Sequence, residues 1–209
     1  MKIIYFMGPD GSGKTTLAKS LAENFSNRRI EVRLAWMRGT HTLASLLARL
    51  LRKFRNMQGE ENPYYRVNIP SKMKPLWHLI EVISIIPIVV RSFLIPKYLG
   101  YTVIGERSPL DFLAWLIMTT NDANILSKIY ARIILAFVLK TGIPIYVKAE
   151  PSILVKRRSG ELSRKSARKQ AAIYNSIAHL TDAFIVDTSS TSIQNNLERI
   201  KSHVNNLFH

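Results

Sequence analysis

An eight-residue segment near the start of the chain places the tightest constraint on its fold. The segment reads Gly8-Pro9-Asp10-Gly11-Ser12-Gly13-Lys14-Thr15 and fits the pattern G-x-x-x-x-G-K-[ST]. An apolar run, Ile3–Met7, precedes it, and a helix-forming stretch from Thr16 to Glu23 follows it. The sequence therefore predicts a strand, a phosphate-binding loop and a helix in direct succession, the repeating unit of a parallel α/β sheet.

The residue types of this loop predict its ligand. Glycines let the backbone curve around a phosphate with its N–H groups turned inward, and the following helix adds the positive end of its dipole. Lys14 can then reach the β- and γ-phosphates, and the Thr15 hydroxyl can bind Mg²⁺. We therefore expect ATP and Mg²⁺ as cofactors. The residues expected to hold the nucleotide are Gly8, Asp10, Gly11, Ser12, Gly13, Lys14, Thr15 and Thr16.

The rest of the chain alternates between apolar runs and helical patterns. The predicted strands are Lys2–Met7, Ile30–Trp36, Tyr101–Gly105, Ile143–Ala149 and Ala183–Val186. The predicted helices are Lys14–Phe25, Thr42–Phe54, Met73–Ile95, Pro109–Thr119, Ala123–Lys140, Pro151–Arg158, Ser163–Leu180 and Ser192–Phe208. This alternation predicts one domain over residues 1–209, with a five-stranded parallel sheet of the P-loop NTPase type, flanking helices and a helical lid at about 157–168.

Composition narrows the functional classes. Thirty Lys and Arg against fourteen Asp and Glu give a formal net charge of +16, which attracts polyanions. The chain has no cysteine, so disulfides and thiolate metal sites are excluded. The N-terminal apolar run is too short for a signal peptide, and we expect a cytoplasmic protein.

The most apolar region of the chain runs from Leu76 to Ile95. A membrane-spanning helix needs about 20 mostly apolar residues with few charges. Polar or helix-breaking residues interrupt this stretch at His78, Glu81, Pro87 and Arg91. We therefore expect a buried helix under a substrate site, with attachment to a membrane surface as the alternative.

Polar residues follow two of the predicted strands, where ligands bind in open α/β sheets. Arg38 comes after the second strand and is placed to bind a phosphate of a second substrate. Glu106 and Arg107 come directly after the third, so that an acid and a cation lie near the transferring phosphoryl group. Glu106 is the expected second Mg²⁺ ligand. Asp111 is a further candidate, although it could also cap the next helix.

A basic segment after the fourth strand has the pattern of a closing lid. Ser159-Gly160 makes a pliable turn between two helical stretches that carry Arg157, Arg158 and Arg164. The transferring phosphoryl group needs a cation in the transition state, and no arginine lies within the phosphate-binding loop. We therefore expect these arginines to act in catalysis together with Lys14.

These features together resemble the thymidylate kinase-like branch of the P-loop nucleoside monophosphate kinases, over nearly the whole chain. The matching segments are Gly8–Thr16, Arg38-Gly39-Thr40, Glu106-Arg107 with Asp111, Arg157–Ser163 and Phe184–Ser189. The resemblance implies that Asp10 approaches the sugar hydroxyl of the acceptor, that Arg38 binds the acceptor phosphate and that the pair at Glu106-Arg107 orients both phosphates. It also implies that the loop from Ser189 borders the adenine, and it suggests a homodimer.

The sequence departs from that family at two places. Glu106-Arg107-Ser108 looks more like the Glu-Arg-Ser of deoxynucleoside kinases than the family's Asp-Arg-Tyr/His/Phe. The stretch that reads thymine in thymidylate kinases corresponds to residues 111–116, which contain Trp115 and no glutamine. We expect phosphoryl transfer from ATP to a (deoxy)nucleoside monophosphate, with thymidylate as the default acceptor and neither nucleic acid nor membrane as a partner.

Two other classes of function stay open. One is a deoxynucleoside kinase, or a kinase of another small acceptor. The other is a P-loop ATPase that binds a nucleic acid or a membrane surface through its basic excess. A nucleic-acid-binding protein would interleave aromatic and basic residues for base stacking, and Tyr64-Tyr65-Arg66 is the one such segment in the sequence.

Overall fold

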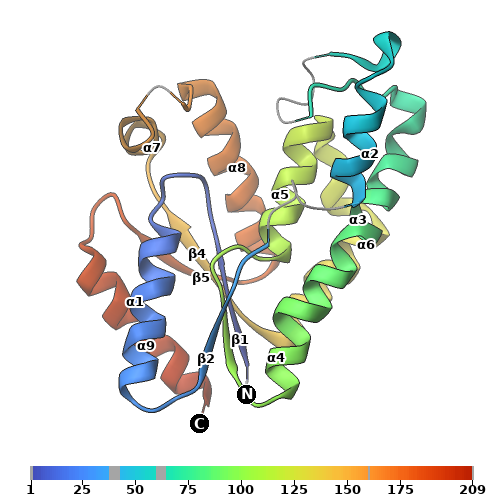
Figure 1. Ribbon diagram of the computed structural model, residues 1–209. Coiled ribbons are helices and arrows are strands. Elements are labelled where there is room, and N and C mark those ends of the chain that lie inside the picture. The colour runs from blue at the N-terminus through green and yellow to red at the C-terminus, as the bar shows by residue number, and fades with distance from the viewer. Residues whose placement is uncertain (1, 38–42, 60–64, 160, 209) are drawn as a thin grey trace.

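A five-stranded parallel sheet forms the centre of the protein (Figure 1). The computed structural model describes residues 2–37, 43–59, 65–159 and 161–208. The strands are β1 (Ile3–Met7), β2 (Val32–Ala35), β3 (Thr102–Gly105), β4 (Gly142–Lys148) and β5 (Phe184–Asp187). Their order is β2-β3-β1-β4-β5, and every pairing is parallel. The predicted fold class is confirmed: this is the α/β architecture of P-loop NTPases.

Helices connect the strands and cover both faces of the sheet. They are α1 (Lys14–Asn27), α2 (Leu43–Leu51), α3 (Lys74–Val89), α4 (Ile95–Tyr98), α5 (Pro109–Thr120), α6 (Ile129–Thr141), α7 (Pro151–Arg157), α8 (Arg164–Leu180) and α9 (Ile193–Phe208). Short 3₁₀ turns occupy Arg55–Met57 (η2), Ser71–Met73 (η3) and Ala123–Ser127 (η5). Each predicted helix is present with shifted ends.

Two predicted helices are divided in the structure. The predicted helix Ala123–Lys140 begins as the 3₁₀ turn η5, because Lys128 is extended and the α-helix starts only after it. The predicted helix Met73–Ile95 contains Pro87, which lacks an N–H for the carbonyl one turn earlier. The helix then widens into a π-turn, η4 (Val90–Leu94), before continuing as α4.

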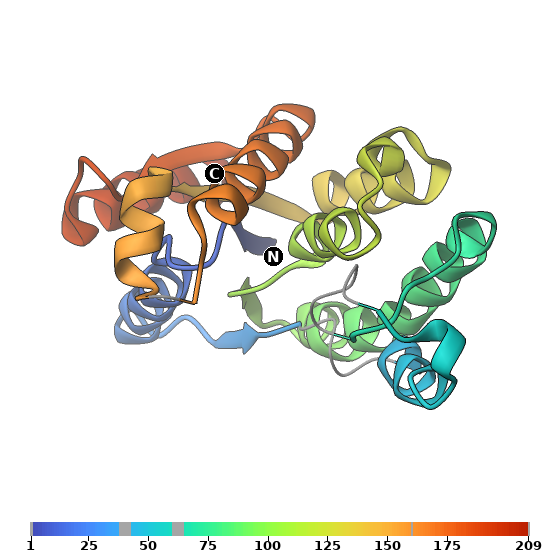
Figure 2. The same cartoon turned by 90° about the horizontal axis from the view of Figure 1, so that it is seen from above.

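Strand β1 shows how the sheet organises the core, because its alternate side chains enter different layers. Ile4 and Phe6 pack with α1 and α9 in one hydrophobic cluster. Ile3, Tyr5 and Met7 pack with α3, η4, α5, α6 and α8 in the other cluster. Figures 1 and 2 show α1 and α9 on one side of the sheet and α3, α5 and α6 on the opposite side.

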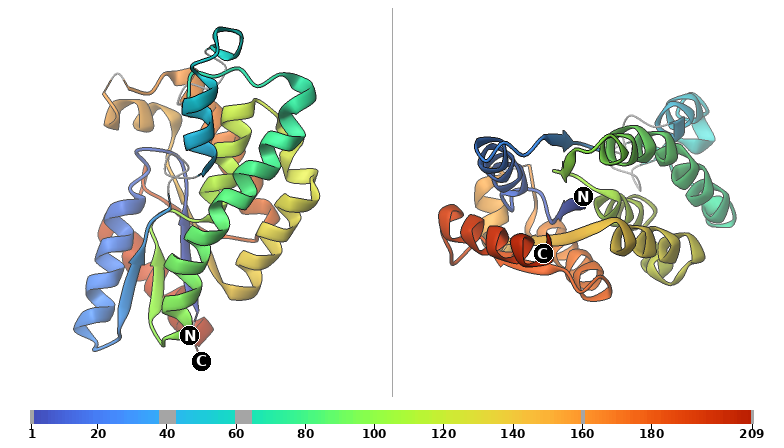
Figure 3. Two further views of the ribbon diagram at one scale, coloured as in Figure 1. Left: turned by 45° about the vertical axis from the view of Figure 1, so that its right-hand side comes forward. Right: turned by 90° about the horizontal axis from the view of Figure 1, so that it is seen from below.

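The apolar region from Leu76 to Ile95 is buried on one side only. Trp77, Glu81 and Ile85 face the interior, whereas Ile83 and Ile86 are each 52% exposed. The prediction of a buried helix is therefore wrong for its outer face, since no described element covers that side. Figure 3 shows α2, α3 and α6 together on the side of the molecule away from α1 and α9.

The continuous helical segment Ser71–Tyr98 is long and apolar enough to cross a membrane by length and composition alone. Its most apolar window has a mean hydropathy of 2.1, and 22% of that window is buried inside the protein.

Candidate functional site

The phosphate-binding loop joins β1 to α1, as the sequence predicts, and its glycines explain its shape. Gly11 and Gly13 have positive φ angles of 87° and 93°, which side-chain-bearing residues rarely adopt. Gly8 has φ of 150°, and a Cβ there would lie 2.3 Å from the carbonyl oxygen of Val147. The backbone can therefore pass this close to β4 only because Gly8 has no side chain.

Lys14 lies buried under the loop. Its ammonium donates hydrogen bonds to the carbonyl oxygens of Gly8, at 2.6 Å, and Pro9, at 2.8 Å. Burial lowers the pKa of Lys14 to about 8, although Asp111 and Asp10 act in the opposite direction. This arrangement holds a desolvated positive charge directly beneath the position where the loop amides would bind phosphate.

The two predicted metal ligands lie next to each other. The Thr15 hydroxyl donates to Glu106 Oε1 at 2.5 Å, across the gap between the first turn of α1 and the end of β3. A hydroxyl and a carboxylate are ligands that Mg²⁺ accepts, with phosphate oxygens and water completing its octahedron. Within the described ranges no cluster of three or more His, Cys, Asp or Glu side chains could hold a metal ion by itself. The pair fits a metal that is bound together with a nucleotide.

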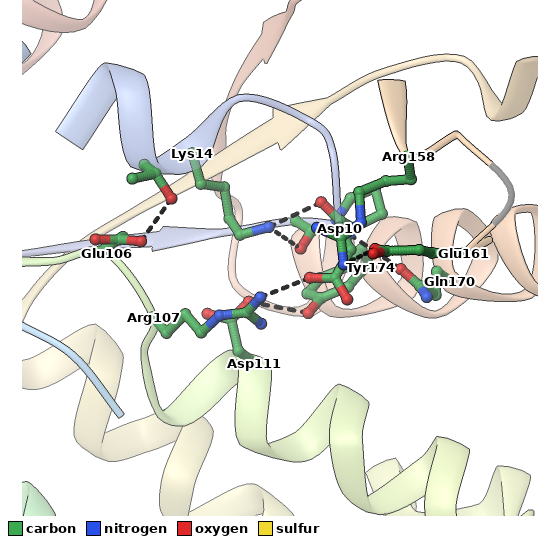
Figure 4. A network of polar contacts seen from close by, with 12 residues as sticks. Asp10, Lys14, Glu106, Arg107, Asp111, Arg158, Glu161, Gln170 and Tyr174 are labelled. Carbon is green, nitrogen blue, oxygen red and sulfur yellow. Dashed lines mark hydrogen bonds and ion pairs between the residues drawn. The ribbon is translucent and has the colours of Figure 1, made fainter. Parts of the chain in front are cut away.

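Arg107 connects the loop after β3 to the phosphate-binding loop. Its Nη2 atom lies 2.6 Å from Asp10 Oδ1, and Figure 4 shows its guanidinium between Asp10 and Asp111. Burial alone would raise the pKa of Asp10, but Arg107 and Lys14 outweigh it and hold that pKa below its usual value. Asp10 is therefore an anion that orients Arg107 rather than a proton donor.

Asp111 caps the start of α5, the alternative that its position in the sequence allowed. Its carboxylate accepts from the Ser108 backbone N–H at 2.9 Å, which forms a capping box at the start of α5. Its other oxygen accepts from the Tyr174 hydroxyl at 2.9 Å. Burial raises the pKa of Asp111, while Lys14 and Arg107 oppose that rise. The structure thus places Asp111 behind Arg107 as a buried support.

Helix α8 contributes two residues that the sequence analysis missed. Gln170 Oε1 accepts from the Asp10 backbone N–H at 3.0 Å, and Tyr174 binds Asp111. The two residues are spaced i, i+4 and therefore share one face of the helix. Ala167 and Ile177 lie on the same face and are apolar. Two polar residues on an apolar helix face were therefore the feature of the sequence that could have identified Gln170 and Tyr174.

The predicted lid arginines separate into two groups. Arg157 donates to the carbonyl oxygens of Gly11, at 3.2 Å, and Thr188, at 2.8 Å. Arg158 packs its side chain over Gly11 and pairs with Glu161 at 2.9 Å. Arg164 is exposed in the first turn of α8 and is absent from the described lining of the nucleotide pocket. The tertiary structure therefore favours Arg157 and Arg158.

These elements enclose a pocket of about 450 Å³. Its lining residues are Asp10, Gly11, Gly13, Lys14, Thr15, Thr16, Arg107, Arg157, Arg158, Thr188 and Ile193. Thr188 and Ile193 were missed, although they flank the predicted segment from Ser189. The Thr188 hydroxyl donates to the carbonyl oxygen of Ser12 at 2.8 Å, and Ser189 instead accepts from the Glu150 backbone N–H at 2.6 Å.

The predicted acceptor residues are only partly described. Arg38 lies outside the described residues. Trp115 projects from α5 and makes an edge-to-face contact with Tyr65, with ring centroids 5.8 Å apart. It does not belong to the described lining of the nucleotide pocket, so any contact with a second substrate would lie on the α2–α3 side of Arg107.

Comparison with known proteins yields one family match. Residues 4–65 match the model of the ATPase family associated with various cellular activities (AAA), and no curated protein matches the chain. The matched part contains the phosphate-binding loop and ends before β3 and the lid, so it covers less than half of the chain. With the parallel sheet order β2-β3-β1-β4-β5, it identifies the protein as a P-loop NTPase that carries an ATP-binding domain.

Proposed function

We propose that this protein transfers the γ-phosphoryl group of ATP to a (deoxy)nucleoside monophosphate, and that thymidylate is the first acceptor to test. The observation that carries the proposal is the position of Arg107 in the wall of the nucleotide pocket, held by Asp10. A guanidinium has five N–H donors, so the bond to Asp10 leaves others for phosphate oxygens of a donor and an acceptor.

The cations of the pocket support the same proposal. Lys14 comes from the phosphate-binding loop, Arg107 from the loop after β3, and Arg157 and Arg158 from α7 and its end. Phosphoryl transfer is catalysed mainly by positioning and by neutralising the charge on the transferring group. Cations that converge from three separate segments meet that requirement better than the phosphate-binding loop alone.

A second candidate is ATP hydrolysis without a small acceptor, which the AAA match favours. The two functions differ in the nucleophile, which is water in one and an acceptor oxygen in the other. The Mg²⁺ site at Thr15 and Glu106 and the role of Lys14 would be common to both.

A screen of acceptors separates the two. ADP release would be measured with Mg²⁺ and ATP alone, then with each common nucleoside monophosphate and each nucleoside, and the product would be identified by mass spectrometry. We expect a nucleoside monophosphate to stimulate ADP release and to gain one phosphate. ADP release that no acceptor changes would support hydrolysis instead, and a nucleoside that serves as well as its monophosphate would support a nucleoside kinase.

A further inference from the structure

The outer face of the helical layer carries a continuous apolar surface. On α3 and η4, one stripe of residues at helical spacing points outward: Leu76, Leu79, Ile83, Ile86 and Val90. Each of these side chains is between 39% and 54% exposed. Soluble proteins seldom leave so regular an apolar stripe uncovered, and such stripes mark interaction surfaces.

Neighbouring helices extend this stripe on both sides. Between η4, α3 and α6 lies an apolar groove of about 270 Å³, with Ile86 and Val90 on one wall and Ile133 and Phe137 on the other. Between α3 and α2 lies a second apolar groove of about 160 Å³, whose lining includes Leu76. The surface formed by α2, α3, η4 and α6 is called the apolar face below. Figures 1 and 3 show these helices together on one side of the molecule.

Every exposed charge on the helices of the apolar face is positive, although Asp122, just before η5, acts electrostatically on His78 of α3 and Tyr130 of α6. In the described stretches 43–59, 65–100 and 128–141 the one acidic residue is Glu81, which is fully buried. Glu60 and Glu61 lie outside the described residues. The basic residues in those stretches are Arg49, Arg52, Lys53, Arg55, Arg66, Lys72, Lys74, Arg91, Lys97, Lys128, Arg132 and Lys140. None of them takes part in an ion pair with another described residue.

An apolar stripe together with basic residues on the same helices favours one kind of binding partner for this face. A second copy of the chain would bring its own basic rim against this one, and like charges across an interface are repulsive. Nucleic acid matches the charge but not the aliphatic stripe, which offers no aromatic ring for stacking. An anionic lipid surface matches both, because acyl chains accept the aliphatic side chains and headgroups attract the Lys and Arg that surround them.

The contacts of this helix fit a position on such a surface rather than across it. Phe93, in η4, is fully buried and packs against Tyr5 of β1, with ring centroids 5.6 Å apart. A helix that crossed the bilayer would have to leave this contact and would expose the core of the sheet. We propose that the apolar face docks the folded protein on anionic membranes, with the α3 stripe inserted at the level of the headgroups.

Vesicle flotation at 150 mM salt tests the proposal without any measurement of activity. Wild-type protein should float with vesicles of phosphatidylcholine and phosphatidylglycerol and much less with phosphatidylcholine alone. The double variant Ile83→Gln/Ile86→Gln should bind about tenfold more weakly. The matched double variant Leu180→Gln/Ile185→Gln, at equally exposed positions on α8 and β5, should bind like wild type.

Three outcomes would overturn the proposal. The first is that the wild-type protein does not bind the anionic vesicles. The second is that the Ile83→Gln/Ile86→Gln variant binds them as well as wild type does. The third is that light scattering shows a dimer for the wild type and a monomer for this variant. The last would assign the face to a second copy.

A fluorescence experiment replaces flotation if the Gln variants unfold. Because the chain has no cysteine, Ile83→Cys and Leu180→Cys each accept one environment-sensitive fluorophore. Emission should shift to the blue on vesicles at position 83 and stay constant at position 180, and equal responses would contradict docking.

Discussion

The guanidinium of Arg107 lies 2.6 Å from the carboxylate of Asp10 and so joins two loops that are 97 residues apart in the chain. The loops follow β3 and β1, which are neighbours in the sheet, so their carboxyl ends meet at one edge. Each side chain is less than a third exposed, and the pair is therefore only partly screened by water. It holds one wall of the nucleotide pocket in place.

Lys14→Ala should abolish turnover while the fold remains intact. The ammonium of Lys14 is buried beneath the phosphate-binding loop, and its loss should cost orders of magnitude in rate because phosphoryl transfer depends on positioned charge. ADP release and the circular dichroism of both proteins provide the measurement.

The affinity of the wild type for ATP should weaken above pH 8. Burial lowers the pKa of Lys14 to about 8, so the free enzyme loses this positive charge as the pH rises. A wild-type affinity that stays constant up to pH 9.5 would argue against this role.

Arg107→Ala should reduce use of the acceptor far more than binding of ATP. A lost charge-assisted hydrogen bond is worth about 1.5–3 kcal/mol, or roughly ten- to a hundredfold in kcat/KM. Asp10→Asn in the Arg107→Ala background should cost less than it does in wild type, since Asp10 then has no guanidinium to orient. Steady-state kinetics of the four proteins would show this coupling. Strictly additive losses would mean that the pair does not act as a unit.

Arg158→Ala should lower kcat by about a hundredfold or more with little change in KM for ATP, the pattern of a contact made in the transition state. Arg157→Ala should affect both constants, because Arg157 also holds the carbonyl oxygens of Gly11 and Thr188. Arg164→Ala is the matched control, because Arg164 belongs to the same basic segment but is absent from the described pocket lining. Loss of kcat in Arg164→Ala alone would reverse the assignment.

Glu81→Gln should remove part of the pH dependence of stability. Burial raises the pKa of Glu81 to about 8, and its carboxylate oxygens form no hydrogen bond of ordinary geometry, although the nearby Trp77 opposes the rise. Between about pH 5 and pH 8 the folded protein keeps a proton that the unfolded chain releases. The free energy of unfolding therefore falls as pH rises, by about 1.4 kcal/mol per unit at most.

Urea unfolding at pH 5.5, 6.5, 7.5 and 8.5 measures this slope. The slope should be shallower in Glu81→Gln, whose amide stays neutral, and unchanged in Glu23→Gln, which alters an exposed carboxylate on α1. A Glu81→Gln slope equal to that of wild type would show that the buried carboxyl does not titrate in this range.

Local sequence was enough to predict the strands, most of the helices and the phosphate-binding loop. The loop needs glycine at positions with positive φ and a lysine as the first residue of the helix, and both requirements are met within eight consecutive residues. The parallel sheet followed from the alternation of apolar runs and helices. The division of the helix at Pro87 was within reach of the sequence, because proline inside a helix removes a hydrogen bond wherever it occurs.

The tertiary structure decided which distant residues meet. Gln170 and Tyr174 reach the site because α8 packs beside the phosphate-binding loop, and Arg158 reaches the pocket while Arg164 does not because a turn separates them. The exposure of Ile83 was likewise set by which elements cover α3. The sequence alone determined what each segment prefers, since propensity and hydrophobic pattern are local. Contact and burial depend on how the segments pack together, so only the folded protein determined the composition of the site and the exposure of its apolar face.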